Sequence, residues 1–160
     1  MKDQDKISIL MIGLDGFEQT NQNIGQPVDD EALKTVAKVL RSMARPQDDC
    51  ARVGSDEFCI LMPGADAPQV SAARERILSA LAKTVIAPQT LNLGIRVSIG
   101  AASLPQDASS AEDLLVRADN SMYAHKRAAA SALTSTRETR MPLPRASDNG
   151  LHIRPARMPA

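Results

Sequence analysis

The sequence predicts an α+β fold, in which helices pack on a mixed sheet. Two strand signals support this: an apolar run at Ile7–Leu14, and alternating apolar residues within Leu91–Ser103. In three other segments apolar residues recur every three or four positions, which is the period of a helix. Together these patterns predict the order strand, helix, hairpin, helix, strand, helix.

The three expected helices have recognisable beginnings. The first begins at an N-cap provided by Asp29 or Asp30, and the second covers about residues 68–82. The third opens at a capping box formed by Ser109 and Glu112. Each helix has one apolar face, so all three are expected to pack on the sheet.

A β-hairpin is expected in the stretch "CARVGSDEFCILMPG", with strands near Cys50–Val53 and Phe58–Met62. The last residue of the first strand is expected opposite the first residue of the second. In that register Cys50 and Cys59 are not paired. The residues between the strands, Gly-Ser-Asp-Glu, place two adjacent carboxylates at the tip of the turn.

Composition argues against several partners. The 160 residues include 19 acidic and 19 basic side chains, so the chain lacks the net basic charge that binding to DNA would need. The aromatic residues, Phe17, Phe58 and Tyr123, are too few to make stacking platforms for single strands. The longest apolar run, Ile7–Ile12, is too short to span a membrane. Two free thiols and no signal peptide favour a cytoplasmic protein.

The C-terminal part of the chain differs from the rest. From about Ala132, the sequence is rich in proline and arginine and has no apolar period. We therefore expect a folded domain at residues 1–131 and a flexible, mildly basic tail at residues 132–160.

Four sequence motifs follow one another along the chain. They are "LDGFEQTNQNIGQPVDDEAL", "ARVGSDEF", "VSIGAAS" and "ADNSMYAHKRA". In order and spacing they resemble the GGDEF domain, the diguanylate cyclase family, over about Ile7–Ala130. The letters "DEF" alone would carry little weight, whereas four motifs in register are specific.

The resemblance implies a five-stranded sheet flanked by helices, related to the adenylyl cyclases and to polymerase palm domains. It also implies an activity, in which two facing domains each hold one GTP and condense the pair to cyclic di-GMP. Such a phosphoryl transfer depends on positioning and on charge neutralisation by Mg²⁺. The family's segment of a helix and a turn before the first strand is expected to be absent here, since that strand begins by Ile7. Either the chain is a fragment, or the domain dispenses with that helix.

The resemblance also implies roles for individual residues. These are Asp56 and Glu57 in catalysis, Asn21 and Asp30 in binding guanine, and Lys126 in binding phosphate. Asp56 and the Leu14 backbone are the implied metal ligands. Asp15 is a separate hypothesis, as a substitute for the ligand missing at position 13. Amide and carboxylate groups suit the edge of a guanine. The alternatives for Asn21 and Asp30 are a loop Asn and a helix N-cap Asp.

Several positions depart from the family pattern. The first metal-binding Asp is replaced by Gly13, and the second Gly of the signature is Ser55. Two phosphate-contacting cations are replaced, by Glu18 and Ala130. Each lost charge-assisted contact is worth about 1.5–3 kcal/mol. We therefore expect impaired catalysis, with Mg²⁺ bound only if GTP is bound.

A second ligand site is expected just before the hairpin. Arg45 and Asp48 form an Arg-x-x-Asp motif, which the resemblance identifies as the family's inhibitory site for cyclic di-GMP. Arg74 or Arg76 on the following helix is expected to add a second guanidinium, with Arg76 favoured. An arginine fork suits a phosphate or the O6/N7 edge of guanine. The alternative is an ordinary helix end followed by a turn.

Three functions follow from these observations. The first is a degenerate GGDEF domain that binds cyclic di-GMP or GTP and signals as a homodimer or by docking on another signalling domain. The second is an active diguanylate cyclase with fewer metal ligands. The third is a vestigial protein-interaction domain that binds no nucleotide.

Overall fold

The computed structural model describes residues 6–16, 26–84 and 95–138. In chain order the elements are β1 (Ile7–Leu14), α2 (Gln26–Met43), β2 (Asp49–Arg52), β3 (Glu57–Pro63), α3 (Ala67–Lys83), β4 (Val97–Leu104) and α4 (Ala111–Glu138). The predicted order of strand, helix, hairpin, helix, strand, helix is confirmed.

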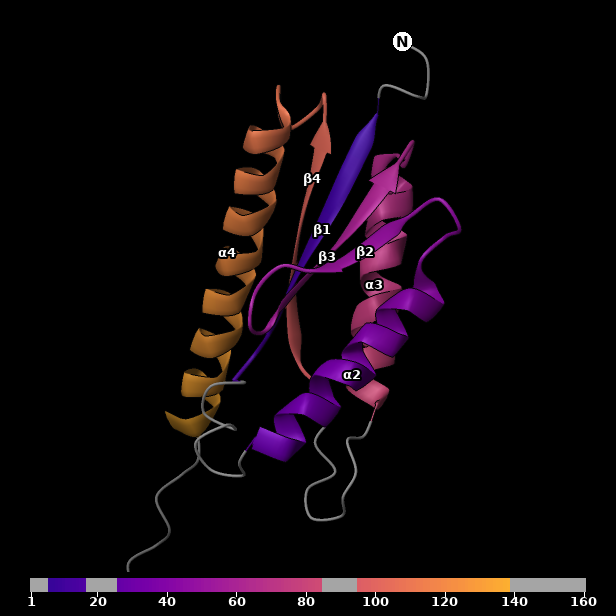
Figure 1. Cartoon of the computed structure of the whole chain (residues 1–160). Helices are drawn as coiled ribbons and strands as arrows, with labels where there is room; N and C mark the ends of the chain where they lie inside the picture. Colours follow the sequence, from indigo (N-terminus) through magenta and orange to yellow (C-terminus); the bar gives the residue numbers. More distant parts are fainter. Residues whose placement is uncertain (1–5, 17–25, 85–94, 139–160) are drawn as a thin grey trace, which may run out of the picture.

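The strands form one sheet with the spatial order β2-β3-β1-β4 (Figure 1). The predicted α+β fold is confirmed, and the described part of the sheet has four strands. Each neighbouring pair among them is antiparallel, whereas a mixed sheet is predicted. The reason for this difference is that an alternating apolar pattern reports which residues are buried and not the direction of a strand. Residues 91–94, the beginning of the predicted last strand, lie outside the described part of the chain.

Helices cover both faces of the sheet. Helices α2 and α3 pack on one face and α4 packs on the other (Figure 1). Strand β1 is buried on both sides: Leu10 and Ile12 belong to the core under α2 and α3, and Ile9 and Met11 belong to the core under α4. This double burial explains why β1 is a continuous apolar run and does not alternate with polar residues.

Helix α4 approaches β4 most closely at Gly100. A Cβ atom added there would overlap the backbone nitrogen of Met122 and the backbone oxygen of Ala118. Ala118 and Met122 are both completely buried. Glycine is therefore required for this close approach, which sets how far the next turn of α4, with Lys126, lies from the sheet.

The structure corrects two details at the ends of elements. The hairpin register differs by one residue from the prediction, because Arg52 and not Val53 pairs with Phe58. The backbone nitrogen of Val53 instead donates to the carbonyl of Glu57 and closes the turn. The first helix begins at Gln26, before the predicted cap at Asp29 or Asp30.

Helix α4 differs from the prediction at both ends. Its cap is Ser110, whose hydroxyl accepts from the backbone nitrogen of Asp113, one residue after the predicted pair Ser109 and Glu112. At the other end the helix continues to Glu138, into the segment predicted as tail. Residues 139–160 lie outside the described part. No helix in the described ranges is long and apolar enough to cross a membrane.

Candidate functional site

A row of three residues crosses the sheet beneath α4. Gly13 on β1 pairs with Glu57 on β3 and with Ser98 on β4. Residues directly opposite each other in antiparallel strands share a face. A Cβ atom at Gly13 would lie against Met122 of α4, so the row is on the α4 side of the sheet. The sheet thus places the hairpin carboxylate Glu57 beside the end of β1.

The tip of the hairpin is held by a residue for which we predict no role. The guanidinium of Arg52 donates from Nε to the carbonyl of Gly54 at 3.0 Å and from Nη2 to the carbonyl of Ser55 at 2.7 Å. Glu57 folds back against the turn, with Oε2 3.0 Å from the position of a Cβ atom on Gly54. A side chain at position 54 would therefore displace Glu57.

The predicted residues Asp56 and Lys126 lie together, although they are far apart in the sequence. Lys126 Nζ is 3.6 Å from Asp56 Oδ2, and the side chains are 29% and 16% exposed. The same ammonium group would be 3.5 Å from a Cβ atom on Gly13. The site therefore brings a carboxylate from the hairpin and a cation from α4 to the end of β1.

The described residues at the end of β1 do not make a metal site by themselves. Asp15, the predicted substitute ligand, accepts a hydrogen bond at 2.7 Å from the Ser98 hydroxyl. Its backbone nitrogen donates to the backbone carbonyl of Arg96. The backbone nitrogen of Leu14 donates to the carbonyl of Asp56. Within the described ranges no three His, Cys, Asp or Glu side chains are grouped as a metal site would require. A Mg²⁺ ion would need ligands from outside this set, such as phosphates.

A histidine adjoins this site on α4. One guanidinium nitrogen of Arg74, Nη2, lies 2.5 and 2.6 Å from the two ring nitrogens of His125. Burial, and then the charge of Arg74, lower the pKa of His125 below its ordinary value of 6.5, whereas the Asp15 carboxylate raises it. Arg74 is thus placed against α4, and among the described residues the buried Nε atom of Arg74 has no hydrogen-bond partner.

The lowered pKa of His125 predicts a loss of stability in mild acid. The His125 side chain takes up a proton near pH 6.5 in the unfolded chain and only at lower pH in the folded chain. The contribution of neutral His125 to the free energy of unfolding is therefore full above pH 6.5. It declines as the pH falls from there toward the folded pKa. We expect the urea midpoint to drop between pH 7.5 and 5.5, and to drop less in His125→Gln. Equal drops in both proteins would show that His125 does not contribute.

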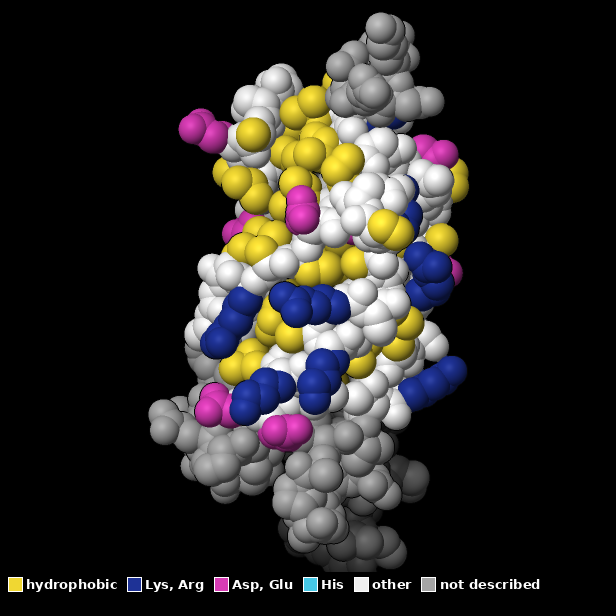
Figure 2. Space-filling model, turned by 45° about the vertical axis from the view of Figure 1, so that its right-hand side comes forward, with side chains coloured by type: hydrophobic (Ala, Val, Ile, Leu, Met, Phe, Trp, Pro, Cys, Tyr) yellow, Lys and Arg dark blue, Asp and Glu magenta, His cyan; other side chains and the backbone are white. Residues whose placement is uncertain are grey.

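A groove runs between α2 and the hairpin. It has a volume of about 420 Å³, within the range of small-molecule sites, and an apolar floor that includes Leu33 and Phe58. Its remaining lining residues are Asp30, Lys34, Ala37, Leu40, Arg41, Cys50, Ala51 and Arg52. Figure 2 shows Lys and Arg side chains gathered on one face with hydrophobic side chains between them. Asp30, predicted to bind guanine, is exposed and borders this groove.

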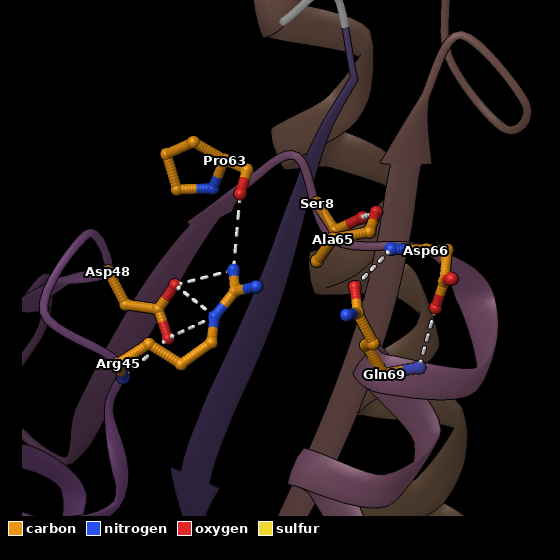
Figure 3. A network of polar contacts seen from close by, with 7 residues as sticks. All are labelled: Ser8, Arg45, Asp48, Pro63, Ala65, Asp66 and Gln69. Carbon is orange, nitrogen blue, oxygen red and sulfur yellow. Dashed lines mark hydrogen bonds and ion pairs between the residues drawn. The ribbon is translucent and has the colours of Figure 1, made fainter. Parts of the chain in front are cut away.

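The predicted pair Arg45 and Asp48 bind each other (Figure 3). Nε and Nη2 of Arg45 donate to Asp48 Oδ1 at 3.0 and 2.7 Å, and the backbone nitrogen of Arg45 donates to Oδ2 at 2.8 Å. Nη2 also donates to the carbonyl of Pro63 at 3.1 Å. The Asp48 hydrogen bond, more than the Coulomb attraction, raises the pKa of Arg45. The Asp48 side chain is 2% exposed, so a ligand reaches it only if this pair opens.

The remaining residues named from the sequence are either on α3 or outside the described part of the chain. Arg76 is exposed on α3, whereas Arg74 is directed to His125. Asn21 and Glu18 lie outside the described residues. Sequence patterns do not indicate roles for Arg52, Ser98 or His125. Arg52 binds carbonyl groups of the hairpin turn, and the partners of Ser98 and His125 are distant in the sequence.

Comparison with known proteins gives the family. Residues 1–132 match the family described as "Diguanylate cyclase, GGDEF domain". Diguanylate cyclase A of Treponema denticola is 32% identical over 123 residues, which are 77% of this chain and 33% of that protein. The chain spans a third or less of the length of the curated relatives it matches.

Solved structures agree with this match. The active GGEEF domain of a diguanylate cyclase from Vibrio cholerae has 27% sequence identity, a TM-score of 0.71 and coverage of 78% of each chain. The GGDEF domain of DgcB from Caulobacter crescentus, in complex with c-di-GMP, has 28% identity and a TM-score of 0.70. That match covers 77% of this chain and 73% of the other. The chain belongs to the GGDEF domain family of diguanylate cyclases.

Proposed function

We propose that this chain is a GGDEF domain with impaired cyclase chemistry that serves as a signalling module responding to guanine nucleotides. The observation that carries the proposal is the site at the end of β1. Gly13 offers no carboxylate, and the hairpin carboxylate Asp56 lies 3.6 Å from the ammonium of Lys126. Catalysis of phosphoryl transfer needs a cation positioned on carboxylates, and this site has lost one of them.

Two features support nucleotide binding without turnover. The groove beside α2 is lined by Asp30 and by the cations Lys34, Arg41 and Arg52, a set that suits a guanine and its phosphates. A second hollow of about 410 Å³ lies beside Arg41 and Arg45. One structural neighbour was solved in complex with c-di-GMP. We propose that Asn21 and Asp30 hold the guanine of GTP beside the groove while Lys126, at the end of β1, holds its phosphates. We propose that cyclic di-GMP uses Arg45 and Arg76.

The contacts of Asp48 change its proposed role in that second site. Its carboxylate is already occupied by Arg45, so Asp48 holds the guanidinium in position while Arg45 and Arg76 meet the ligand. The expected partners are a second copy of the domain or another signalling domain, with no DNA and no membrane involved. A cytoplasmic location is part of this proposal.

The turnover test is an incubation with GTP and Mg²⁺, followed by chromatography of the nucleotides. We expect less than one cyclic di-GMP per protein molecule, because one metal carboxylate is missing. A known active GGDEF domain under the same conditions is the positive control. Multiple turnovers that are abolished by Asp56→Asn would establish the second candidate function, an active cyclase. The presence of Asp56, Glu57 and Lys126 favours that candidate.

Calorimetry with cyclic di-GMP tests the receptor role. Binding is expected, and Arg76→Ala should weaken it about tenfold or more, because a charge-assisted contact is worth about 1.5–3 kcal/mol. Arg127→Ala is the matched control, since it removes an exposed arginine from another helix. If neither cyclic di-GMP nor GTP binds, the vestigial interaction domain is the correct function.

A further inference from the structure

We infer that the ammonium of Lys126 is a built-in counter-ion for the hairpin carboxylate Asp56 and takes the place of a divalent cation in this domain. The inference deepens the proposed function and rests on it, because it describes the same site. It concerns metal binding by the protein alone, however, so its test does not depend on turnover or on a nucleotide.

The charges in the site support this role. Lys126 Nζ lies 3.6 Å from Asp56 Oδ2, and both side chains are largely shielded from solvent. A divalent cation bound to this carboxylate oxygen would be within a few ångströms of a like charge, which disfavours it strongly at partly buried sites. The pair comes from two separate elements, the hairpin and α4, and the close approach at Gly100 fixes their separation.

Side chains of α4 lie where a side chain at position 13 would extend. A Cβ atom there would be 3.5 Å from Lys126 Nζ and 3.0 Å from Sδ of Met122. Side chains of α4 therefore fill the space beside the end of β1. A carboxylate introduced at this position would extend from that Cβ toward the ammonium and pair with it before it could bind a metal ion.

Several other oxygen atoms around the site already accept hydrogen bonds. Asp15 accepts from Ser98, and the carbonyls of Gly54 and Ser55 accept from Arg52. The carbonyl of Asp56 accepts from the backbone nitrogen of Leu14. Mg²⁺ is usually held by one or two protein carboxylates, with water and phosphate oxygens as its other ligands, so the charge of Lys126 beside Asp56 bears directly on metal binding at this site.

The experiment is a titration of the full chain with Mn²⁺ alone. The electron paramagnetic resonance signal of the free ion measures how much Mn²⁺ remains unbound. The wild type is expected to bind Mn²⁺ weakly at this site. Lys126→Met should bind it about tenfold more tightly or better, because the competing charge is gone. Gly13→Asp alone should change affinity less than about threefold, whereas Gly13→Asp with Lys126→Met should bind most tightly of the four.

Two controls make the result specific. Arg127→Met removes the neighbouring positive charge from an exposed position of the same helix and should leave Mn²⁺ affinity unchanged. Asp56→Asn in the Lys126→Met background should abolish the gain, and circular dichroism should report the same fold for every variant. If Lys126→Met binds Mn²⁺ no better than the wild type, or if Gly13→Asp alone gives the full gain, the inference is overturned. Absence of nucleotide turnover would affect neither result.

Discussion

Replacing Gly100 with alanine is expected to lower the free energy of unfolding by about 3 kcal/mol or more, the largest effect that we predict for this domain. The new Cβ atom would overlap the backbone of Ala118 and Met122, and backbone atoms in a helix cannot rotate aside as a side chain can. Either α4 moves away from β4 or the protein loses stability. Urea denaturation followed by circular dichroism measures the change.

Gly16 provides the control for this substitution. Its φ is +72°, and a Cβ atom there would meet nothing within 4 Å. Gly16→Ala therefore introduces backbone strain without a clash, which costs about 1–2 kcal/mol. If Gly100→Ala is no more destabilising than Gly16→Ala, the close packing of α4 on β4 is not a determinant of stability. A displaced α4 should also change Mn²⁺ binding at Asp56, because Lys126 would move with the helix.

Replacing Arg45 with alanine is expected to cost about 2–3 kcal/mol, the second largest effect. The substitution removes three hydrogen bonds to the Asp48 carboxylate and one to the Pro63 carbonyl. Asp48 is 2% exposed, so its charge would be left in the protein with one remaining donor, the backbone nitrogen of residue 45. Because Arg45 itself is 27% exposed, we expect less than the loss from a fully buried pair.

A double-mutant cycle distinguishes this pairing from lost packing. Asp48→Ala alone should also be destabilising, and Arg45→Ala with Asp48→Ala should cost less than the two single changes added together. Arg41→Ala, an exposed position in the last turn of α2, just before Arg45 in the chain, is the matched control and should stay within about 0.5 kcal/mol of the wild type. Additive single effects would show that Arg45 and Asp48 act independently.

Local patterns predicted the elements of this fold more reliably than their pairing. Strand β1 and helix α3 follow from apolar runs and periods, and α3 has its buried stripe at Val70, Ala73, Ile77 and Leu81. The hairpin register was wrong by one residue, because the turn is closed by a backbone hydrogen bond that no side-chain pattern reports. The end of α4 was missed because its last part is rich in alanine, which favours a helix without an apolar period.

The site was predicted in part for a similar reason. Motifs located Asp56 and Lys126, and the structure brings them together across the sheet. They did not indicate that Lys126 would pair with Asp56, because that depends on the room beside Gly13 and on the position of α4. Nor did they indicate that Asp48 would be buried against Arg45, since an Arg-x-x-Asp spacing is the same for a ligand site and for an internal pair.

The length of α4 has a mechanical consequence. With 28 residues it is about 42 Å long, whereas the 8-residue strand β4 beside it is about 26 Å long. Among the described side chains of α4, the last that is fully buried is Met122, one turn before Lys126. Lys126 therefore lies at the boundary between a part of the helix that is anchored by fully buried side chains and a part in which no described side chain is fully buried. A ligand that separates Lys126 from Asp56 would act at this boundary, where the part of the helix after Lys126 is held by fewer buried side chains than the part before it.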